Sequence, residues 1–90
     1  MKTTSIITVN FNQPQVTIDF LKSVKQHTSV NEVEVIVVCN GSSEDHGDAY
    51  KAVYPGLVYI RSEHNLGFAG GNNLGVEVAK GDFLLLLNNK

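Results

Sequence analysis

The run Asp82-Phe83-Leu84-Leu85-Leu86-Leu87-Asn88-Asn89-Lys90 decides the fold class of this chain. Its unbroken apolar centre is typical of a strand buried on both faces, as in the middle of a parallel sheet. Two amides and an ammonium follow that strand. In open α/β sheets, ligands bind along the carboxyl ends of the strands. The polar end therefore indicates a binding site, and because the sequence stops at Lys90, we expect the opposite wall of that site to lie outside this chain.

The residues before this run alternate between strand-like and helix-like segments. The predicted strands, which are apolar and largely β-branched, lie at residues 5–9, 33–38, 57–60 and 83–87. The predicted helices run from Pro14 through the apolar stripe that ends at Val24, from Ser42 towards Val53, and from Gly67 to Lys80. This βαβαβαβ order favours one Rossmann-like, three-layer α/β/α domain, a parallel sheet of about four strands in the order 3-2-1-4.

Local signals refine the ends and packing of these helices. Ser42 followed by Asp45 resembles a capping box at the start of the short second helix. Gly81 follows the third helix at a position where a left-handed cap is common. Gly71 and Gly75 lie one helical turn apart, so they allow that helix to approach the sheet closely.

The composition limits the classes of function and the cellular compartment. Ninety residues allow one small domain, and a net charge of −2 does not support nucleic-acid binding. A single cysteine, Cys39, excludes an internal disulfide and is typical of a reducing compartment. No apolar stretch has the length of a signal peptide or a transmembrane helix. We therefore expect a cytoplasmic protein.

Three segments follow the predicted strands at their carboxyl ends, namely residues 10–13, 39–43 and 88–90. In a parallel sheet these segments share one edge, which is the physical basis for a binding site there. The glycine-rich stretch from Asn65 to Asn73 opens a helix, whose free N–H groups suit an anion such as a diphosphate. Its spacing matches neither the dinucleotide nor the triphosphate fingerprint. Close packing alone also explains the glycines, although Asn72 and Asn73, read as first-turn amides, favour a ligand.

Other polar residues have ordinary explanations. Cys39 is interpreted as a small, half-buried apolar residue rather than a reactive thiol. The three histidines lack metal-ligand spacing and are interpreted as solvated residues: His27, His46 and His64. The acidic group Glu44, Asp45 and Asp48 is interpreted as the charge pattern of a helix start rather than a metal site. No pair of nucleophile and base can be assembled, so no catalytic residue is predicted.

Taken together, these motifs resemble the family 2 glycosyltransferases with the GT-A fold, and most closely their rhamnosyltransferase-like members. The resemblance is carried, in the family's order, by Ser5-Ile6-Ile7-Thr8-Val9-Asn10-Phe11-Asn12, by Val35 to Ser43, by Asn65 to Gly75, and by Gly81 to Asn89. It covers only the nucleotide-binding half of such an enzyme. It implies transfer of a sugar from a nucleotide-diphosphate sugar to an acceptor hydroxyl, with a divalent cation, Mg²⁺ or Mn²⁺, in the intact enzyme.

The resemblance also implies site residues. The nucleobase position corresponds to Asn10, Phe11 and Cys39, the nucleotide-side Asn-x-Gly to Asn73 and Gly75, and the metal motif to Asn88-Asn89-Lys90. The full candidate set for nucleotide binding is Asn10, Phe11, Cys39, Asn40, Gly71, Asn72, Asn73, Asn88 and Asn89. The general base and acceptor pocket of the family lie outside these motifs.

Two departures from the family pattern change the expected activity. Cys39 stands where the family usually has an aspartate that accepts a hydrogen bond from the base, and sulfur is a weak acceptor. Lys90 replaces the last acid of the metal motif, and an ammonium repels a cation. We therefore expect the chain to be a truncated enzyme that is weak or inactive alone.

The alternatives are a non-catalytic nucleotide-binding module or a degenerate remnant that oligomerises. A third alternative, a Rossmann dehydrogenase domain, is disfavoured because the glycine fingerprint of that class is missing from this sequence. We expect a homo-oligomer, because the strand from Phe83 to Leu87 would be an open sheet edge.

Overall fold

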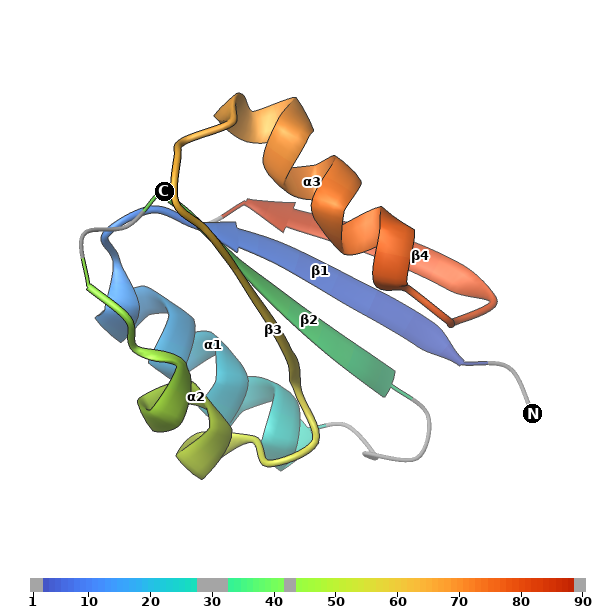
Figure 1. Ribbon diagram of the computed structural model, residues 1–90. Coiled ribbons are helices and arrows are strands. Elements are labelled where there is room, and N and C mark those ends of the chain that lie inside the picture. Colours follow the sequence, from blue (N-terminus) through green and yellow to red (C-terminus); the bar gives the residue numbers. More distant parts are fainter. Residues whose placement is uncertain (1–2, 28–32, 42–43, 89–90) are drawn as a thin grey trace.

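The computed structural model describes residues 3–27, 33–41 and 44–88. Seven elements alternate along the chain (Figure 1). The strands are β1 (Thr4–Asn10), β2 (Val33–Asn40), β3 (Val58–Ser62) and β4 (Phe83–Asn88). The helices are α1 (Pro14–His27), α2 (Gly47–Val53) and α3 (Gly67–Val78). None of the helices among these residues is long and apolar enough to cross a membrane.

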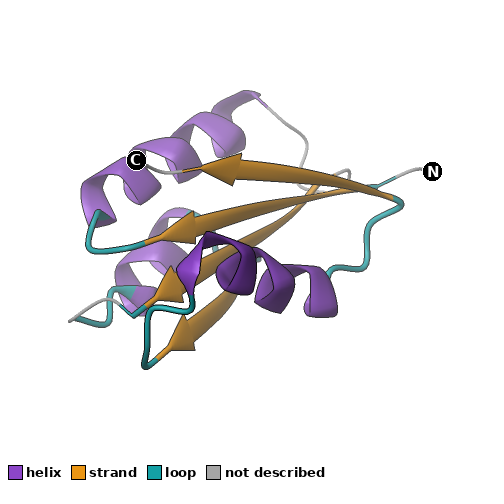
Figure 2. Cartoon of the chain, turned by 90° about the horizontal axis from the view of Figure 1, so that it is seen from above, coloured by secondary structure: helices purple, strands orange, loops and turns teal. Residues whose placement is uncertain are grey.

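The sheet has the predicted order, β3-β2-β1-β4, and every neighbouring pair is parallel. Helices α1 and α2 cover one face and α3 covers the other, which confirms the three-layer α/β/α architecture (Figures 1 and 2). The order follows from the crossovers, because each helix must return the chain to a strand that runs in the same direction. The chain moves from β1 outward to β3 and then crosses to the far side of β1, so the topological switch point lies between β1 and β4.

The two faces of the sheet hold separate apolar clusters. Alternate residues of β2 point to opposite faces, so Val35 and Val37 meet α1 and α2, whereas Ile36 and Val38 meet α3. The first cluster is completed by Leu21, Val24, Cys39, Tyr50, Tyr54 and Leu57. The second is completed by Ile7 and Val9, with Leu74 of α3 packed against it. Because β2 is covered on both sides, it forms the centre of the core.

Helix α3 lies close to β1 because two of its residues lack a side chain. A Cβ atom on Gly71 would lie 2.8 Å from Cγ1 of Val9, and one on Gly75 would overlap Cγ2 of Ile7. Ile7 is fully buried and Val9 nearly so, so neither has room to move. The predicted role of the Gly71 and Gly75 pair in close packing is confirmed.

Strand β4 differs from its prediction in burial and not in position. It pairs only with β1 at the edge of the sheet, as the predicted order and the expected open edge require, but the apolar run predicts a strand buried on both faces. About half of each side chain in its centre remains exposed: Phe83 55%, Leu84 50%, Leu85 46% and Leu86 51%. Helix α3 packs mainly over β1 and β2, so the central side chains of β4 stay about half exposed on both faces. The apolar composition of β4 indicates that the strand needs to be buried, but it does not indicate which element covers it.

The predicted cap at Gly81 is wrong. Helix α3 ends at Val78, Ala79 is extended, and the described glycines with positive φ are Gly41 and Gly67. Gly81 instead lies against β1, where its N–H donates a 2.8 Å hydrogen bond to Oγ of Ser5 and a Cβ would lie 2.6 Å from the Ser5 nitrogen. This glycine therefore serves a close backbone approach.

Helix α2 also begins later than predicted, at Gly47 rather than near Ser42. Ser42 lies outside the described residues, so the capping box itself is not seen. Asp45 remains before the helix, where its Oδ1 accepts hydrogen bonds of 2.9 Å from the Gly47 N–H and from the Tyr59 hydroxyl. This carboxylate ties the start of α2 to β3, and both hydrogen bonds hold its pKa below the usual value.

Candidate functional site

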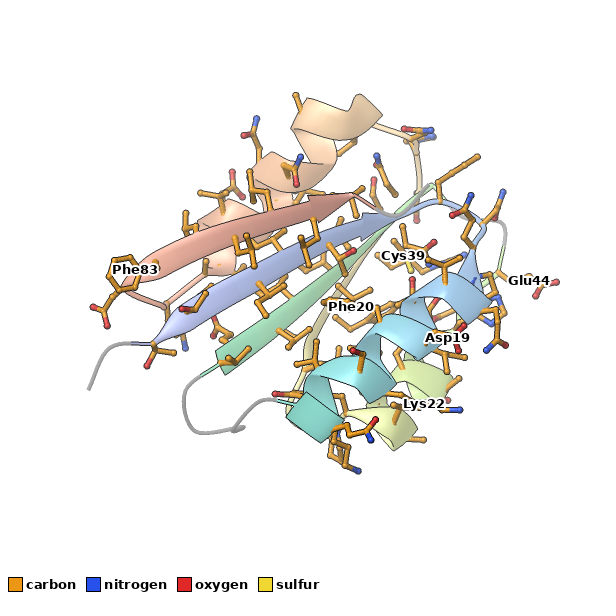
Figure 3. All side chains as sticks on the ribbon, turned by 180° about the vertical axis from the view of Figure 1, so that it is seen from behind. Asp19, Phe20, Lys22, Cys39, Glu44 and Phe83 are labelled. Carbon is orange, nitrogen blue, oxygen red and sulfur yellow. The ribbon has the colours of Figure 1, made fainter. Side chains whose placement is uncertain are left out.

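The polar side chains that end β1 and β2 meet at the carboxyl edge of the sheet. Asn10 stands beside Cys39 in the parallel register, and Asn40 follows at the end of β2. Figure 3 shows Cys39 towards this end of the molecule and Phe83 towards the other. Asn10, Cys39 and Asn40 are each at most 3% exposed. The predicted convergence of these three residues is present, but their side chains lie beneath the surface.

Asn10 closes the turn before α1. Its Nδ2 donates to the Tyr50 hydroxyl at 2.8 Å and, more weakly, to Sγ of Cys39 at 3.9 Å. Its Oδ1 accepts from the Gln13 N–H at 3.0 Å. Both ends of the amide are therefore engaged within the fold, which fixes the backbone that presents Phe11 at the surface.

Cys39 is a fully buried thiol, and it is therefore more buried than the half-buried apolar residue that the sequence analysis expected. Burial raises its pKa above the usual value, although hydrogen bonds from Tyr59, Asn10 and Tyr50 oppose the shift. A thiol that keeps its proton and is closed off from solvent is a poor nucleophile. The structure therefore does not favour the reactive-thiol alternative.

The same burial makes the fold sensitive to alkali. Burial raises the pKa of Tyr50 from its ordinary value of 10.0 to about 12, and it also raises the pKa values of Cys39 and Tyr59. The unfolded chain loses these protons at lower pH than the folded chain does. The Tyr50 contribution to stability is therefore complete below pH 10 and is lost as the pH rises towards about 12.

We expect urea unfolding to show a free energy of unfolding that falls above about pH 9, first through Cys39 and then through the tyrosines. Tyr50→Phe should be less stable than the wild type near neutral pH, because it leaves Nδ2 of Asn10 with only the weaker acceptor, Sγ of Cys39. Its free energy of unfolding should also fall less steeply at alkaline pH, because one group with a raised pKa is gone. Parallel pH profiles for the two proteins would contradict this assignment.

Asn40 and Gly41 hold the segment that leads into α3. Nδ2 of Asn40 donates to Oδ1 of Asn65 at 3.1 Å and to the Gly67 carbonyl at 2.8 Å, while its Oδ1 accepts from the Leu66 N–H at 2.9 Å. Gly41 has φ +80, and a Cβ there would lie 2.5 Å from the Asn65 nitrogen. These contacts bring the start of α3 to the same edge as the ends of β1 and β2.

The first turn of α3 presents backbone N–H groups at this edge. The helix begins at Gly67, whose N–H donates to Oδ1 of Asn65 at 2.9 Å, and the capping residue Leu66 makes no side-chain cap. The N–H groups that follow have no partner inside a helix, which leaves them suited to an anion. The prediction that Asn72 and Asn73 occupy the first turn is wrong, because the helix starts five residues before Asn72.

The remaining candidates on α3 divide by exposure. Gly71 is buried against Val9, as described above, and is placed for packing. Asn73 is exposed, whereas Oδ1 of Asn72 is buried and finds no hydrogen-bond partner within the described residues. Of this group, Asn73 is the side chain most accessible to a ligand.

A cleft that sequence reasoning missed opens at the same end of the molecule. We call it the edge cleft. It has a volume of about 210 Å³ and is lined by Asn12, Pro14, Glu44 and His46. Nε2 of His46 lies 3.4 Å from Oε2 of Glu44. His46 was interpreted as a solvated residue and Glu44 as a helix-start charge. Their position in the sequence could have indicated this cleft, since both residues follow β2 at the edge where ligands bind.

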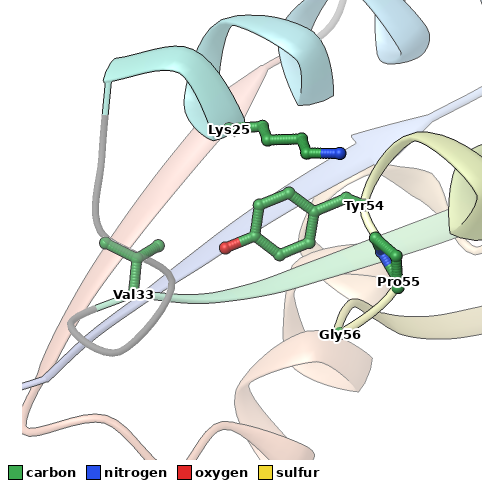
Figure 4. A pocket seen from close by; sticks show the side chains of 5 residues that line it. All are labelled: Lys25, Val33, Tyr54, Pro55 and Gly56. Atoms are coloured by element: carbon green, nitrogen blue, oxygen red, sulfur yellow. The ribbon is translucent and has the colours of Figure 1, made fainter.

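A larger cavity of about 380 Å³ lies away from this edge (Figure 4). It is lined by Lys25, Val33, Tyr54, Pro55 and Gly56. Val33 begins β2, so this cavity is at the amino end of that strand. Its walls contain none of the residues that end the parallel strands, and it has no part in the candidate site.

The metal motif lies mostly beyond the described part of the chain. The backbone of Asn88 ends β4 beside Val9, whereas Asn89 and Lys90 fall outside the described residues. Residues 3–27, 33–41 and 44–88 contain no group of three or more His, Cys, Asp or Glu side chains that suits a metal ion. The donor set at the motif, two amides and an ammonium by sequence, does not fit a divalent cation, which prefers carboxylate oxygens.

Comparison with known proteins agrees with this geometry. An uncharacterized glycosyltransferase of Haemophilus influenzae is 38% identical over 85 residues, which are 94% of this chain and 28% of the relative. One of Mycobacterium tuberculosis is 32% identical over 87 residues, which are 97% of this chain and 33% of the relative. The chain therefore spans about a third or less of the length of these relatives.

Solved structures share the fold. S. aureus TarS 1–349 in complex with UDP is 25% identical, with a TM-score of 0.77 over 96% of this chain and 27% of that one. The mannosyltransferase PcManGT from Pyrobaculum calidifontis, in complex with GDP-Man and Mn²⁺, has a TM-score of 0.82 at 17% identity over 97% of this chain and 27% of that one. The predicted GT-A, Rossmann-like fold is confirmed. The family model described as Glycosyl transferase family 2 matches residues 5–89, and the chain belongs to that family.

Proposed function

We propose that this chain forms the nucleotide-binding part of an enzyme that transfers a sugar from a nucleotide-diphosphate sugar to an acceptor hydroxyl. The observation that carries the proposal is the convergence, at one sheet edge, of the edge cleft and the first turn of α3. A cleft and a set of backbone N–H groups suit the two ends of a nucleoside diphosphate. Two structural neighbours form complexes with UDP and with GDP-Man, which supports this ligand class.

In the reaction, the acceptor oxygen forms a bond to the anomeric carbon, and the bond from that carbon to the diphosphate breaks. The hydroxyl proton must go to a general base, for which we assign no residue of this chain. The chain's own contribution is to bind and orient the leaving nucleoside diphosphate. We therefore propose that the isolated chain is weak or inactive as a catalyst.

The candidate residues take different parts in this proposal. Phe11, which is 47% exposed, and Asn73 are accessible for direct contact with the nucleotide. The buried candidates Asn10, Cys39 and Asn40 hold the two loops in place beneath it. We propose Asn88, which ends β4, and Asn89, which follows it in the sequence, as diphosphate contacts. Gly71 contributes by keeping α3 close to β1.

We expect weak binding of UDP or GDP that Mg²⁺ or Mn²⁺ improves little, because the sequence places an ammonium at the metal motif and a thiol at the base acceptor. Isothermal titration calorimetry on the wild type and on Lys90→Asp tests the metal part. We expect the variant, and not the wild type, to gain affinity when Mn²⁺ is added.

Cys39→Asp tests whether the base reaches position 39, where the side chain is 1% exposed. A carboxylate accepts hydrogen bonds more strongly than sulfur does, so the affinity should rise only if the base makes this contact. Tight, metal-dependent binding by the unmodified chain would contradict the weak-binding expectation. Absence of any binding at millimolar nucleotide would contradict the proposed function itself. A non-catalytic nucleotide-binding module is the second candidate, favoured by Lys90, an ammonium where the family's metal motif has an acid.

We also propose that the chain is a cytoplasmic homo-oligomer. Its cysteine is a free, buried thiol, which suits a reducing compartment. Strand β4 is an edge with half-exposed leucines on both faces, and such edges recruit further strands. A second copy that pairs through β4 would extend the sheet and cover these side chains.

Sedimentation at micromolar concentration should therefore show a dimer or larger species. Leu85→Lys places a charge in the middle of the edge strand and should shift the chain towards monomer. Val76→Lys is the matched control, since Val76 is a similarly exposed apolar residue on α3. A wild type that sediments as a stable, cooperatively folded monomer would overturn the proposal.

A further inference from the structure

The cavity in Figure 4, which we call the distant cavity, has the size and lining of a small-molecule site. Its volume of about 380 Å³ lies within the roughly 300–1,000 Å³ that is typical of such sites. Most of its lining is apolar, and Lys25 and Tyr54 supply its polar side-chain groups. Apolar walls that carry a few polar groups are the usual lining of a ligand pocket.

The fold holds the walls of the distant cavity in place. Val33 begins β2, Lys25 lies in the last turn of α1, and Tyr54 follows the last residue of α2. The Tyr54 N–H donates to the Tyr50 carbonyl at 2.9 Å, and the Tyr54 carbonyl accepts from the Leu57 N–H at 3.1 Å. These two hydrogen bonds fix the turn between α2 and β3, so the cavity is formed before any ligand arrives.

The hydroxyl of Tyr54 has no hydrogen-bond partner within the described part of the chain. The residue is 4% exposed, and burial alone raises its pKa. A hydroxyl taken out of bulk water without a partner costs free energy, which a ligand that bonds to it would recover. Figure 4 shows this hydroxyl directed along the cavity towards Val33. The orphaned group therefore indicates where a polar atom of a ligand would lie.

The charge at the distant cavity is positive. Figure 4 shows the Lys25 ammonium towards the end of the cavity away from the Tyr54 hydroxyl. Each of the two helix ends at the cavity carries about half a negative charge, but Lys25 and Lys51 in the last turns of α1 and α2 outweigh it. The carboxylate of Glu34 is turned to the other face of the sheet, where it accepts from the Ser5 hydroxyl at 2.8 Å. The cavity therefore favours an anionic group.

We propose that the distant cavity is a second ligand site, which binds a small organic acid with an apolar body. The anionic group of the acid pairs with the Lys25 ammonium, and a second polar group bonds to the Tyr54 hydroxyl. Val33 and Pro55 contact the apolar body between them. Because this site lies at the amino end of β2, it can be occupied while a nucleotide is bound at the carboxyl edge. The proposal does not depend on the proposed function.

Two single-ring acids provide the probes. 4-Hydroxyphenylacetate carries both polar groups, whereas phenylacetate lacks the hydroxyl. Titrations of the full chain followed by amide chemical shifts should show changes at residues 24–26 and 53–57. The hydroxylated acid should bind about fivefold more tightly, the value of one net hydrogen bond. Tyr54→Phe keeps the ring and should give the two acids equal affinity. Lys25→Met keeps the apolar stem and should weaken both about tenfold, because a bond to a charged group is stronger.

Two controls separate recognition from unspecific apolar binding. Lys22→Met removes the same charge from an exposed position of α1 outside the cavity lining and should leave both affinities unchanged. Tyramine keeps the ring and the hydroxyl but carries an ammonium in place of the acid, so it should bind at least tenfold more weakly than 4-hydroxyphenylacetate. The inference is overturned if neither acid binds at millimolar concentration or if tyramine binds as tightly as the acid. Unchanged affinities in Lys25→Met, or a hydroxyl preference that survives in Tyr54→Phe, would overturn it as well.

Discussion

Gly41→Ala should destabilise the chain by about 3 kcal/mol, the sum of a left-handed backbone penalty of about 1–2 kcal/mol and an overpacking penalty of about 1–3 kcal/mol. Gly41 has φ +80, a conformation that residues with a Cβ rarely adopt. The added methyl would also lie 2.5 Å from the Asn65 nitrogen and 2.9 Å from the Asn65 Cα. These are backbone atoms, so relief requires the whole segment before α3 to move.

Gly67→Ala is the matched control for this prediction. Gly67 has nearly the same φ, +75, but apart from its chain neighbours and the backbone of its own helix, no atom lies within 4 Å of the position of its Cβ. Gly67→Ala should therefore be destabilised only by the backbone penalty, about 1 kcal/mol. Urea unfolding of both variants measures the difference. Equal losses would show that the contact between Gly41 and the segment before α3 does not constrain the fold.

Asn40→Ala should cost about 3 kcal/mol, because it removes three hydrogen bonds of about 1 kcal/mol each from a side chain that is 3% exposed. Asn40→Asp tests the role of the donor. It keeps the acceptor for the Leu66 N–H but turns an oxygen towards Oδ1 of Asn65 and the Gly67 carbonyl. We expect it to be no more stable than the alanine variant.

Asn73→Ala serves as the control for asparagine removal. Asn73 is exposed on α3, where alanine has the better helix propensity, so its stability should stay within about 0.5 kcal/mol of the wild type. Thermal unfolding of the variants gives the ranking. An Asn40→Ala protein as stable as Asn73→Ala would contradict the assigned role of Asn40 in holding the start of α3.

The strand order could be predicted from the sequence because it depends on local patterns and one general rule. Alternation of β-branched runs with amphipathic segments predicts parallel strands, and right-handed crossovers then leave few arrangements. The close approach of Gly71 and Gly75 to the sheet could be predicted in the same way, from helical spacing alone, although not the strand that they meet. These features are repeated or local, so single residues do not decide them.

The features that the sequence did not predict depend on contacts between distant segments. The edge cleft joins Asn12 and Pro14 to Glu44 and His46, which lie about thirty residues further along the chain. The burial of Cys39 depends on tyrosines from α2 and β3. The exposure of β4 depends on the placement of α3 over β1 and β2 instead. No periodicity within one segment carries this information.

The most direct test of the account is a nitrogen-15 amide spectrum of the full chain recorded with and without UDP. We expect shifts to concentrate at the carboxyl edge of the sheet, in residues 10–14, 44–47 and 65–71, which include the edge cleft and the first turn of α3. Residues around the distant cavity at Tyr54 and Gly56 should stay unchanged. A spectrum unaffected by saturating UDP, or shifts confined to that distant cavity, would contradict a nucleotide site at this edge.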